Sequence, residues 1–270
     1  MKKYTTVLTI AGSDGSGGAG IQADIKTYAA LECYGLSVIT ALTAQNTIGV
    51  NTVYPLAATC VTEQFKAITS DITIDAVKIG MLGNAAIIKA VAALLNGLKG
   101  DPPIILDTIL SSSSGTMLLP LEAIDLLKSE LFPLASLITP NLPEAALLTG
   151  AKHLPATPEA IEESALKLLE IGANAVLIKG GHSEENECRD CLLHNNRYHW
   201  FSSKKIMTRN THGTGCTLSS AIAAFMARGE KTENAVKKAK TYLEEALQAG
   251  AYYQLGNGNG PLHHCYRLWR

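Results

Sequence analysis

Short apolar runs alternate along this chain with stretches whose apolar residues have helical spacing. Residues 7–11 form a brief apolar run that ends at a glycine, as buried strands do. Ile21, Ile25 and Tyr28 then recur at the spacing of one helix face. The pattern predicts further strands at 36–42, 76–79, 104–107, 136–139 and 175–179, and helices at 58–70, 84–97, 120–131 and from 157 to about 169. This alternation predicts a three-layer α/β/α sandwich with a mostly parallel central sheet.

The last third of the chain departs from that alternation. Asn195-Asn196 lies between two apolar stretches, which predicts an antiparallel hairpin over 189–206 at the sheet edge. Helices are expected at 215–228 and 232–250. The sequence has no linker, repeat or low-complexity segment, so we expect a single domain over residues 1–270.

Composition narrows the class of protein. With 47% hydrophobic and 17% charged residues, the chain is not wholly disordered. The formal charge of −1 leaves no broad basic field, so no nucleic-acid partner is expected. No apolar run approaches 18 residues and the N-terminal one is too short for a signal peptide. We therefore expect no membrane partner, a cytoplasmic location and six reduced cysteines.

Chemically versatile residues follow the predicted strands, where open parallel sheets bind ligands. They are Gly12-Ser13-Asp14, Gln45-Asn46, Gly80-Met81, Asp107, Asn141 with Glu144, and the stretch 179–182. Their coherence predicts a small-molecule site, although strand ends also meet ordinary polar turns.

The first glycine-rich stretch contains G-x-G-x-x-G at Gly15, Gly17 and Gly20, between a strand and a helix. Such spacing can indicate dinucleotide binding. However, Asp14 would repel a pyrophosphate, and no acid near residues 43–45 could hold a ribose hydroxyl. The NAD alternative is therefore weak.

The second glycine-rich stretch, residues 211–217, leads directly into a helix. Its backbone N–H groups and the helix dipole favour an anion hole for a transferring phosphoryl group. Cys216 would lie in the first turn, where the dipole should hold its thiol pKa below about 8.5. The alternative is a flexible loop with a small buried cysteine. The sequence has no G-x-x-x-x-G-K-[ST], so any phosphate is not held by a Walker loop.

Other candidates are less specific. Asn141 and Glu144 offer oxygen ligands that suit Mg²⁺ through water, but the same pair could simply cap a helix. Cys188 and Cys191 supply only half of a zinc site and should face opposite sides of a strand. His263-His264 is read as a surface or packing pair.

Together, seven ordered motifs resemble hydroxymethylpyrimidine/phosphomethylpyrimidine kinases of the ribokinase-like superfamily. The motifs are residues 11–14, 16–24, 41–47, 77–82, 139–145, 179–182 and 211–217, and the similarity continues to residues 260–262. The resemblance implies a ribokinase-like fold and a kinase that uses ATP and Mg²⁺. Its substrates would be 4-amino-5-hydroxymethyl-2-methylpyrimidine and the corresponding monophosphate, in thiamine biosynthesis.

The resemblance also implies residue roles. The pyrimidine would contact Gly12, Ala19, Asp24, Gln45 and Met81, with the Gln45 amide on the ring edge. The anion hole would comprise Gly213, Thr214, Gly215 and Cys216, with Cys216 next to the attacking hydroxyl. Lys179 and Thr211 would lie by the ATP phosphates, and Asp107, Asn141 and Glu144 would organise Mg²⁺.

One departure from the family pattern concerns the segment after residue 107. Four serines occupy it, and Ser113 stands about where relatives carry a flap lysine, which bears on the second phosphorylation. A vitamin B6 kinase of the same fold and a non-catalytic binding protein are the alternatives. Members of the family are commonly homodimers, so a homodimer is expected.

Overall fold

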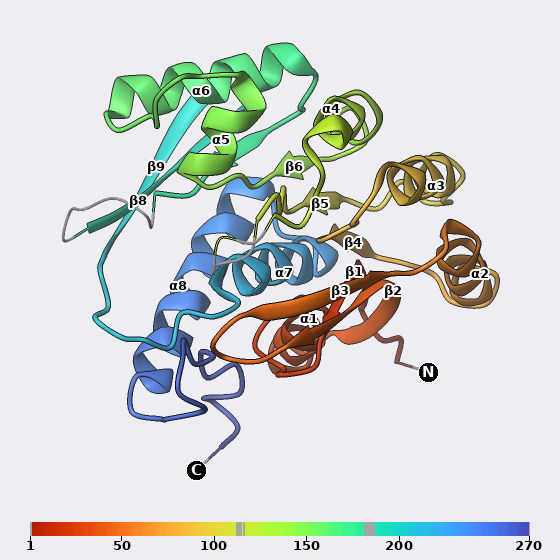
Figure 1. Ribbon diagram of the computed structural model, residues 1–270, viewed down its shortest axis with the longest axis horizontal. Helices are drawn as coiled ribbons and strands as arrows, with labels where there is room; N and C mark the ends of the chain where they lie inside the picture. The colour runs from red at the N-terminus through yellow and green to blue at the C-terminus, as the bar shows by residue number, and fades with distance from the viewer. Residues whose placement is uncertain (1, 112–114, 116, 181–186, 270) are drawn as a thin grey trace.

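The computed structural model describes residues 2–111, 115, 117–180 and 187–269, and within them a nine-stranded sheet runs through the molecule (Figure 1). The strand order is β3-β2-β1-β4-β5-β6-β7-β8-β9. Six neighbouring strands are parallel to one another: β2, β1, β4, β5, β6 and β7. The strands β3, β8 and β9 are antiparallel to their neighbours. The bounds are β1 Thr6–Asp14, β2 Tyr34–Gln45, β3 Val50–Pro55, β4 Ala76–Ile79, β5 Ile104–Leu106, β6 Leu137–Ile138, β7 Val176–Ile178, β8 Glu187–His194 and β9 Arg197–Lys204.

Helices cover both faces of this sheet. On one face lie α2 (Ala58–Thr69), α3 (Ala85–Asn96), α4 (Ile124–Leu131), α5 (Leu142–Thr149) and α6 (Pro158–Ile171). On the other lie α1 (Gly20–Ala30), α7 (Thr214–Ala227) and α8 (Thr232–Gly250) (Figure 1). A short 3-10 turn, η1 (Leu121–Ala123), precedes α4. The result is the expected three-layer α/β/α sandwich.

Side chains of the central strands alternate between two hydrophobic cores. Leu8 and Ile10 of β1 face the α2–α6 layer, while Val7 faces the layer of α1, α7 and α8. The layer of α1, α7 and α8 also receives polar side chains. Thr9 of β1 and Lys78 of β4 alternate along their strands with the residues that enter the first core, so they point to the opposite face of the sheet. Polar groups thus lie beneath α1 and α7, close to where both helices begin.

The predicted elements are confirmed, with boundary shifts of a few residues. The hairpin is confirmed too: Asn195 and Asn196 adopt positive φ, at 51° and 57°, between β8 and β9. The edge strand β3 was not predicted, because Val50–Pro55 contains few strongly apolar residues. The single-domain organisation over 1–270 stays a prediction, which the continuous sheet supports.

Within the described part of the chain, no helix combines the length and the apolarity that a membrane span needs. All six cysteines are described, and each is a free thiol. Cys191 is buried and Cys188 is half-buried, in agreement with the expected opposite faces of β8.

Candidate active site

The carboxyl ends of the central strands bring several predicted residues together. Gly12, near the end of β1, lies against Met81, since a Cβ on Gly12 would be 3.2 Å from the Met81 sulfur. Met81 follows β4 and is largely buried, and its carbonyl accepts a 2.5 Å hydrogen bond from the Thr40 hydroxyl. Gln45, half-buried at the end of β2, lies near the loop before α7 through its 3.2 Å contact with His212. Three of the substrate residues implied by resemblance, Gly12, Gln45 and Met81, thus lie at one edge of the sheet.

The first glycine-rich loop is organised by its own carboxylate. Asp14 accepts hydrogen bonds from the backbone N–H groups of Ser16 (2.9 Å) and Ala19 (2.8 Å), and from the Ser16 hydroxyl. Burial would raise the pKa of Asp14, but these bonds and the His212 contact lower it to about 2. The N–H groups that a dinucleotide would need are therefore taken, which argues against the NAD alternative.

The second glycine-rich stretch leaves its helix start open. Gly213 precedes α7 with φ of +84°, and within the described residues no side chain caps the helix. The N–H group of Thr217 donates to the carbonyl of Gly213, so those of Gly215 and Cys216 precede the first turn of intrahelical bonds. Such a start attracts anions, as predicted.

The two glycine-rich stretches are packed against each other. A Cβ on Gly213 would lie 1.8 Å from the carbonyl oxygen of Gly18, and a Cβ on Gly18 would lie 2.2 Å from the His212 ring. Only glycine permits these approaches. Ala19 and the start of α7 are thereby held side by side.

A lysine and a carboxylate lie over the same helix start. Lys179, after β7, binds Asp107, after β5, at 2.9 Å. A Cβ on Gly215 would lie 3.4 Å from the Lys179 ammonium and 3.7 Å from the Asp107 carboxylate. Burial alone would lower the pKa of Lys179, but Asp107 and Glu144 raise it above its usual value. A permanent cation therefore lies beside the open N–H groups.

Asn141 and Glu144 form a reciprocal cap at the start of α5. The Asn141 side chain accepts from the Glu144 N–H, and the Glu144 carboxylate accepts from the Asn141 N–H, both at 2.8 Å. The helix-cap alternative is therefore correct for their direct contacts. Burial raises the pKa of Glu144 to about 7, with Lys179 opposing the shift.

These residues fit a hydrated cation better than a directly bound one. Among the described residues, no cluster of three or more His, Cys, Asp or Glu side chains could hold a metal. Asp107 is occupied by Lys179, Thr139 and Ser219. However, the raised pKa of Glu144 marks a buried carboxyl group whose charge is incompletely balanced, which a nearby hydrated Mg²⁺ would stabilise.

The expected low pKa of Cys216 is wrong. The residue does lie in the first turn of α7, but it is buried, and burial raises the pKa of its thiol to about 11 despite the nearby Lys78 ammonium. The cost of removing a thiolate from water outweighs the helix dipole and the lysine. In the unliganded protein Cys216 is a neutral thiol.

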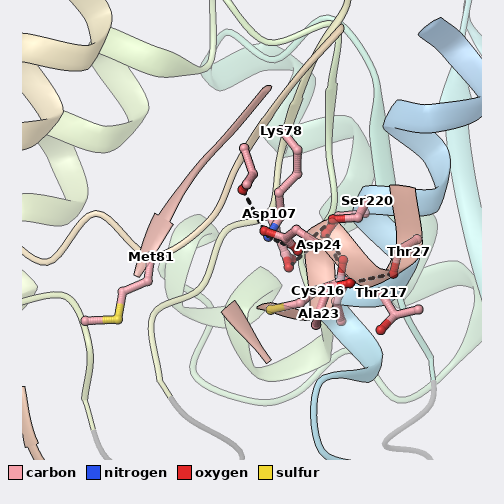
Figure 2. Close-up of polar contacts among 12 residues, drawn as sticks. Ala23, Asp24, Thr27, Lys78, Met81, Asp107, Cys216, Thr217 and Ser220 are labelled. Atoms are coloured by element: carbon pink, nitrogen blue, oxygen red, sulfur yellow. Dashed lines mark hydrogen bonds and ion pairs between the residues drawn. The ribbon is translucent and has the colours of Figure 1, made fainter. Parts of the chain in front are cut away.

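Direct contact of Asp24 with a substrate is also contradicted. Asp24 is completely buried on α1, where its carboxylate binds the Lys78 ammonium at 2.9 and 3.0 Å. It also accepts a 2.6 Å bond from the Ser220 hydroxyl (Figure 2). A second 2.6 Å bond comes from the Thr9 hydroxyl. Every Asp24 oxygen is satisfied from within the protein, so this residue joins α1, β1, β4 and α7 beneath the site.

Sequence reasoning missed Lys78 and the part played by His212. Lys78 stands in an apolar strand sequence and gives no signal, whereas His212 belongs to a motif in which roles were predicted for Thr211, the glycines and Cys216 but not for the histidine. Thr211 is exposed at the entrance to α7. Ser113, Gly181 and His182, which the sequence analysis singled out, lie outside the described residues.

Solved structures share this fold. The pyridoxal kinase of Staphylococcus aureus, solved in complex with AMP-PCP and pyridoxal, superposes with a TM-score of 0.90 at 30% identity. The match covers 99% of this chain and 96% of that one. The fold is therefore that of the ribokinase-like small-molecule kinases.

The particular family follows from sequence. A family model described as phosphomethylpyrimidine kinase matches residues 14–263, and the chain belongs to that family. It is 46% identical to the hydroxymethylpyrimidine/phosphomethylpyrimidine kinase of Escherichia coli, over 99% of this chain and all of that one. It is also 44% identical to the thiamine biosynthesis bifunctional protein ThiED of Geobacter sulfurreducens, covering 96% of this chain and 52% of that protein.

Proposed function

We propose that this protein transfers phosphate from ATP to 4-amino-5-hydroxymethyl-2-methylpyrimidine and then to the resulting monophosphate, for thiamine biosynthesis. Family membership supports the kinase activity and the pyrimidine substrate. The observation that carries the proposal is the meeting of Lys179 and the open start of α7 at Gly215. A cation and free N–H groups at one point can stabilise the charge of a transferring phosphoryl group.

In this proposal each group at the α7 start has a separate role. In the loop from Gly213 to Cys216, the open N–H groups of Gly215 and Cys216 hold the phosphoryl oxygens, while the Thr214 N–H is bonded to the Thr211 carbonyl. Lys179 and Thr211 face the ATP phosphates. Because the thiol is neutral, Cys216 contacts the substrate hydroxyl without being a preformed base. Phosphoryl transfer depends mainly on positioning and charge stabilisation, so it can proceed without a strong base.

Mg²⁺ would bind with the nucleotide and neutralise charge on its phosphates. Glu144 and Asn141 would reach it through water, and Asp107 would act mainly by holding Lys179. The capping box fixes the Glu144 carboxylate against the Asn141 backbone, so its position is set before any ligand binds.

The pyrimidine would lie between Met81 and the Ala19 end of the first loop, with Gly12 letting the ring approach β1. The Gln45 amide would pair with the ring nitrogen and the amino group. A vitamin B6 kinase is the second candidate, since a structural relative was solved with pyridoxal. That substrate has no amino group for Gln45 to bind, which favours the pyrimidine.

Product analysis with ATP tests the proposal. We expect hydroxymethylpyrimidine to give first the monophosphate and then the diphosphate, and pyridoxal and pyridoxine to react at least tenfold more slowly. Formation of the monophosphate alone would limit the activity to one step. Preferred phosphorylation of pyridoxal would establish the second candidate instead.

Gly215→Ala tests the proposed phosphate position in the same assay. Its added methyl group stands at ordinary contact distance, 3.4 Å from the Lys179 ammonium, so the fold should persist while the phosphate position is filled. We expect at least a 100-fold loss of turnover. Gly97→Ala, at the end of α3 with its nearest contact at 3.7 Å, should leave turnover unchanged.

The finer expectations on compartment and assembly stay part of the proposal. We infer a cytoplasmic location, which the free thiols accommodate, and a homodimer, which the resemblance implies. Sedimentation of the purified protein at micromolar concentration tests the dimer.

A further inference from the structure

Three residues far apart in sequence form a hydrogen-bonded row next to the proposed substrate position. The His212 Nε2 atom lies 2.8 Å from Asp14 Oδ2 and 3.2 Å from the side-chain nitrogen of Gln45. The Asp14 and His212 side chains are only 4% and 9% exposed. Water therefore has little access to the contact between Asp14 and His212, and the donors and acceptors of this pair must balance internally.

The Asp14 end of the row is an acceptor. Its carboxylate already accepts from the N–H groups of Ser16 and Ala19 and from the Ser16 hydroxyl. Burial raises the pKa of Asp14, but the His212 contact and these three bonds lower it to about 2, so the group is ionised at neutral pH. The His212 Nε2 atom must then carry the hydrogen and donate it to Asp14.

That assignment fixes what Gln45 can present to the ring. A protonated Nε2 has no lone pair, so the Gln45 amide oxygen, not its nitrogen, can interact favourably with it. The other end of the amide agrees. The Thr43 hydroxyl donates its only hydrogen to the Ser13 carbonyl at 2.9 Å, so it has none left for Gln45 Oε1, which lies 3.1 Å away. The Thr43 oxygen is therefore free to accept from the Gln45 NH₂ group.

We propose that Asp14 and His212 act as a positioning pair that locks the Gln45 amide with its oxygen toward His212 and its nitrogen toward Thr43. In this structure the two atoms lie in the opposite order, with Nε2 3.2 Å from His212 and Oε1 3.1 Å from Thr43. An amide's oxygen and nitrogen exchange places by rotation about one bond, and the network selects between the two orientations. In the locked orientation the amide keeps one lone pair and one N–H for a ligand, in a fixed order. The inference rests on the proposed function for the identity of that ligand.

The locked amide reads the order of groups on the ring edge. A 4-aminopyrimidine offers an acceptor nitrogen next to an amino donor, which complements it. The 4-oxo analogue, 5-hydroxymethyl-2-methylpyrimidin-4-one, offers the reverse order, an N–H donor next to a carbonyl acceptor. The ring cannot simply turn over, because its hydroxymethyl group must face the start of α7. The pair is thus expected to reject oxo analogues, because mismatched buried groups are costly.

The first measurement concerns the hydrogen itself. In ¹⁵N-labelled protein, the His212 ring should show a protonated Nε2 between pH 6 and 8, without any substrate. An unprotonated Nε2 would overturn the proposal, whatever the enzyme phosphorylates. If the wild type phosphorylates neither pyrimidine, the proposed function fails, and this spectrum still decides the lock.

The second measurement is the ratio of kcat/KM for the amino and oxo pyrimidines. His212→Leu removes the donor, and we expect the ratio to fall at least tenfold, mainly through a higher KM for the amino compound. His212→Gln places an amide nitrogen at the same number of bonds from Cβ as Nε2, so it should keep the ratio within threefold of wild type. His194→Gln, in the β8–β9 hairpin, is the matched control.

A wild-type ratio in a His212→Leu protein that unfolds cooperatively would refute the lock. Should that variant fail to fold, the spectrum and the His212→Gln ratio decide the question. A ratio that collapses in His212→Gln despite a native fold and a protonated wild-type Nε2 would also count against it.

Discussion

The two glycine-rich helix starts of this protein look alike in sequence and differ in chemistry. At the start of α1, the Asp14 carboxylate occupies the N–H groups of Ser16 and Ala19. At the start of α7, none of the residues 214–217 is acidic and no described side chain caps the helix. The first loop is closed by an internal anion, and the second remains open to an external one.

Glycine spacing alone therefore does not define an anion site. What matters is whether the chain supplies its own carboxylate, since a buried ionised group excludes a second anion by repulsion and by taking the donors. The closed loop instead serves as a wall against which the open one is packed, through Gly18 and Gly213.

Substitutions that push the helix starts of α1 and α7 apart should have the largest effect on activity. Gly213→Ala places a methyl group 1.8 Å from the Gly18 carbonyl at a φ of +84°, and Gly18→Ala drives one into the His212 ring. We expect either variant to lose at least 100-fold in kcat/KM, or to fail to fold. Gly15→Ala, which meets nothing within 4 Å, is the control. Near-normal activity of Gly213→Ala would contradict the described contact.

A third helix start, that of α5, tests whether an ionised carboxylate at a helix start always stabilises the folded protein. The pKa of Glu144 is raised to about 7, so the folded protein holds this proton more tightly than the unfolded chain. Stability should therefore fall as pH rises from about 4.5 to 7, by at most about 3 kcal/mol. Urea unfolding should show a flatter profile for Glu144→Gln. Exposed Glu159→Gln should not change it.

Asp14 should show the opposite sign. Its folded pKa of about 2 lies below the unfolded value, so its contribution is complete above about pH 4 and is lost as pH falls toward 2. The contribution is about 2 kcal/mol. Urea unfolding of Asp14→Asn between pH 2 and 6 should lack that acid loss, whereas Asp71→Asn on the surface should retain it. Equal acid sensitivity of Asp14→Asn and wild type would count against the closed loop.

The smallest effect concerns the thiol at the open start. With a pKa of about 11, Cys216 should react slowly with iodoacetamide, and its rate should still be rising at pH 10. In the urea-unfolded protein, the rate at Cys216 should level off once the pH exceeds the ordinary thiol pKa of about 8.5. Mass spectrometry of the Cys216 peptide follows both, with Cys216→Ser as the blank. A rate that levels off below pH 8 in the folded protein would show that Cys216 is a thiolate at neutral pH after all.

Periodic patterns made most of the fold predictable, and burial explains the failures. The α3 stretch has strong helical spacing and was placed within a residue at each end, whereas β3 has little apolar signal. The dipole acting on Cys216 is visible in sequence, but the burial that outweighs it is not. Likewise, nothing in the sequence pairs Asp24 with Lys78, because the partners are 54 residues apart.

The placement of α7 has a consequence for how the chain folds. The N-terminal strand β1 lies near the middle of the sheet, and one face of β1, β4 and β5 contacts α7, whose residues come 200 positions later than β1. During synthesis, Val7, Ala76 and Ile105 therefore lack their cover until α7 emerges from the ribosome. Such long-range closure slows folding and leaves apolar surface exposed. The nascent chain thus exposes this part of its sheet face until α7, in the last quarter of the chain, has been made.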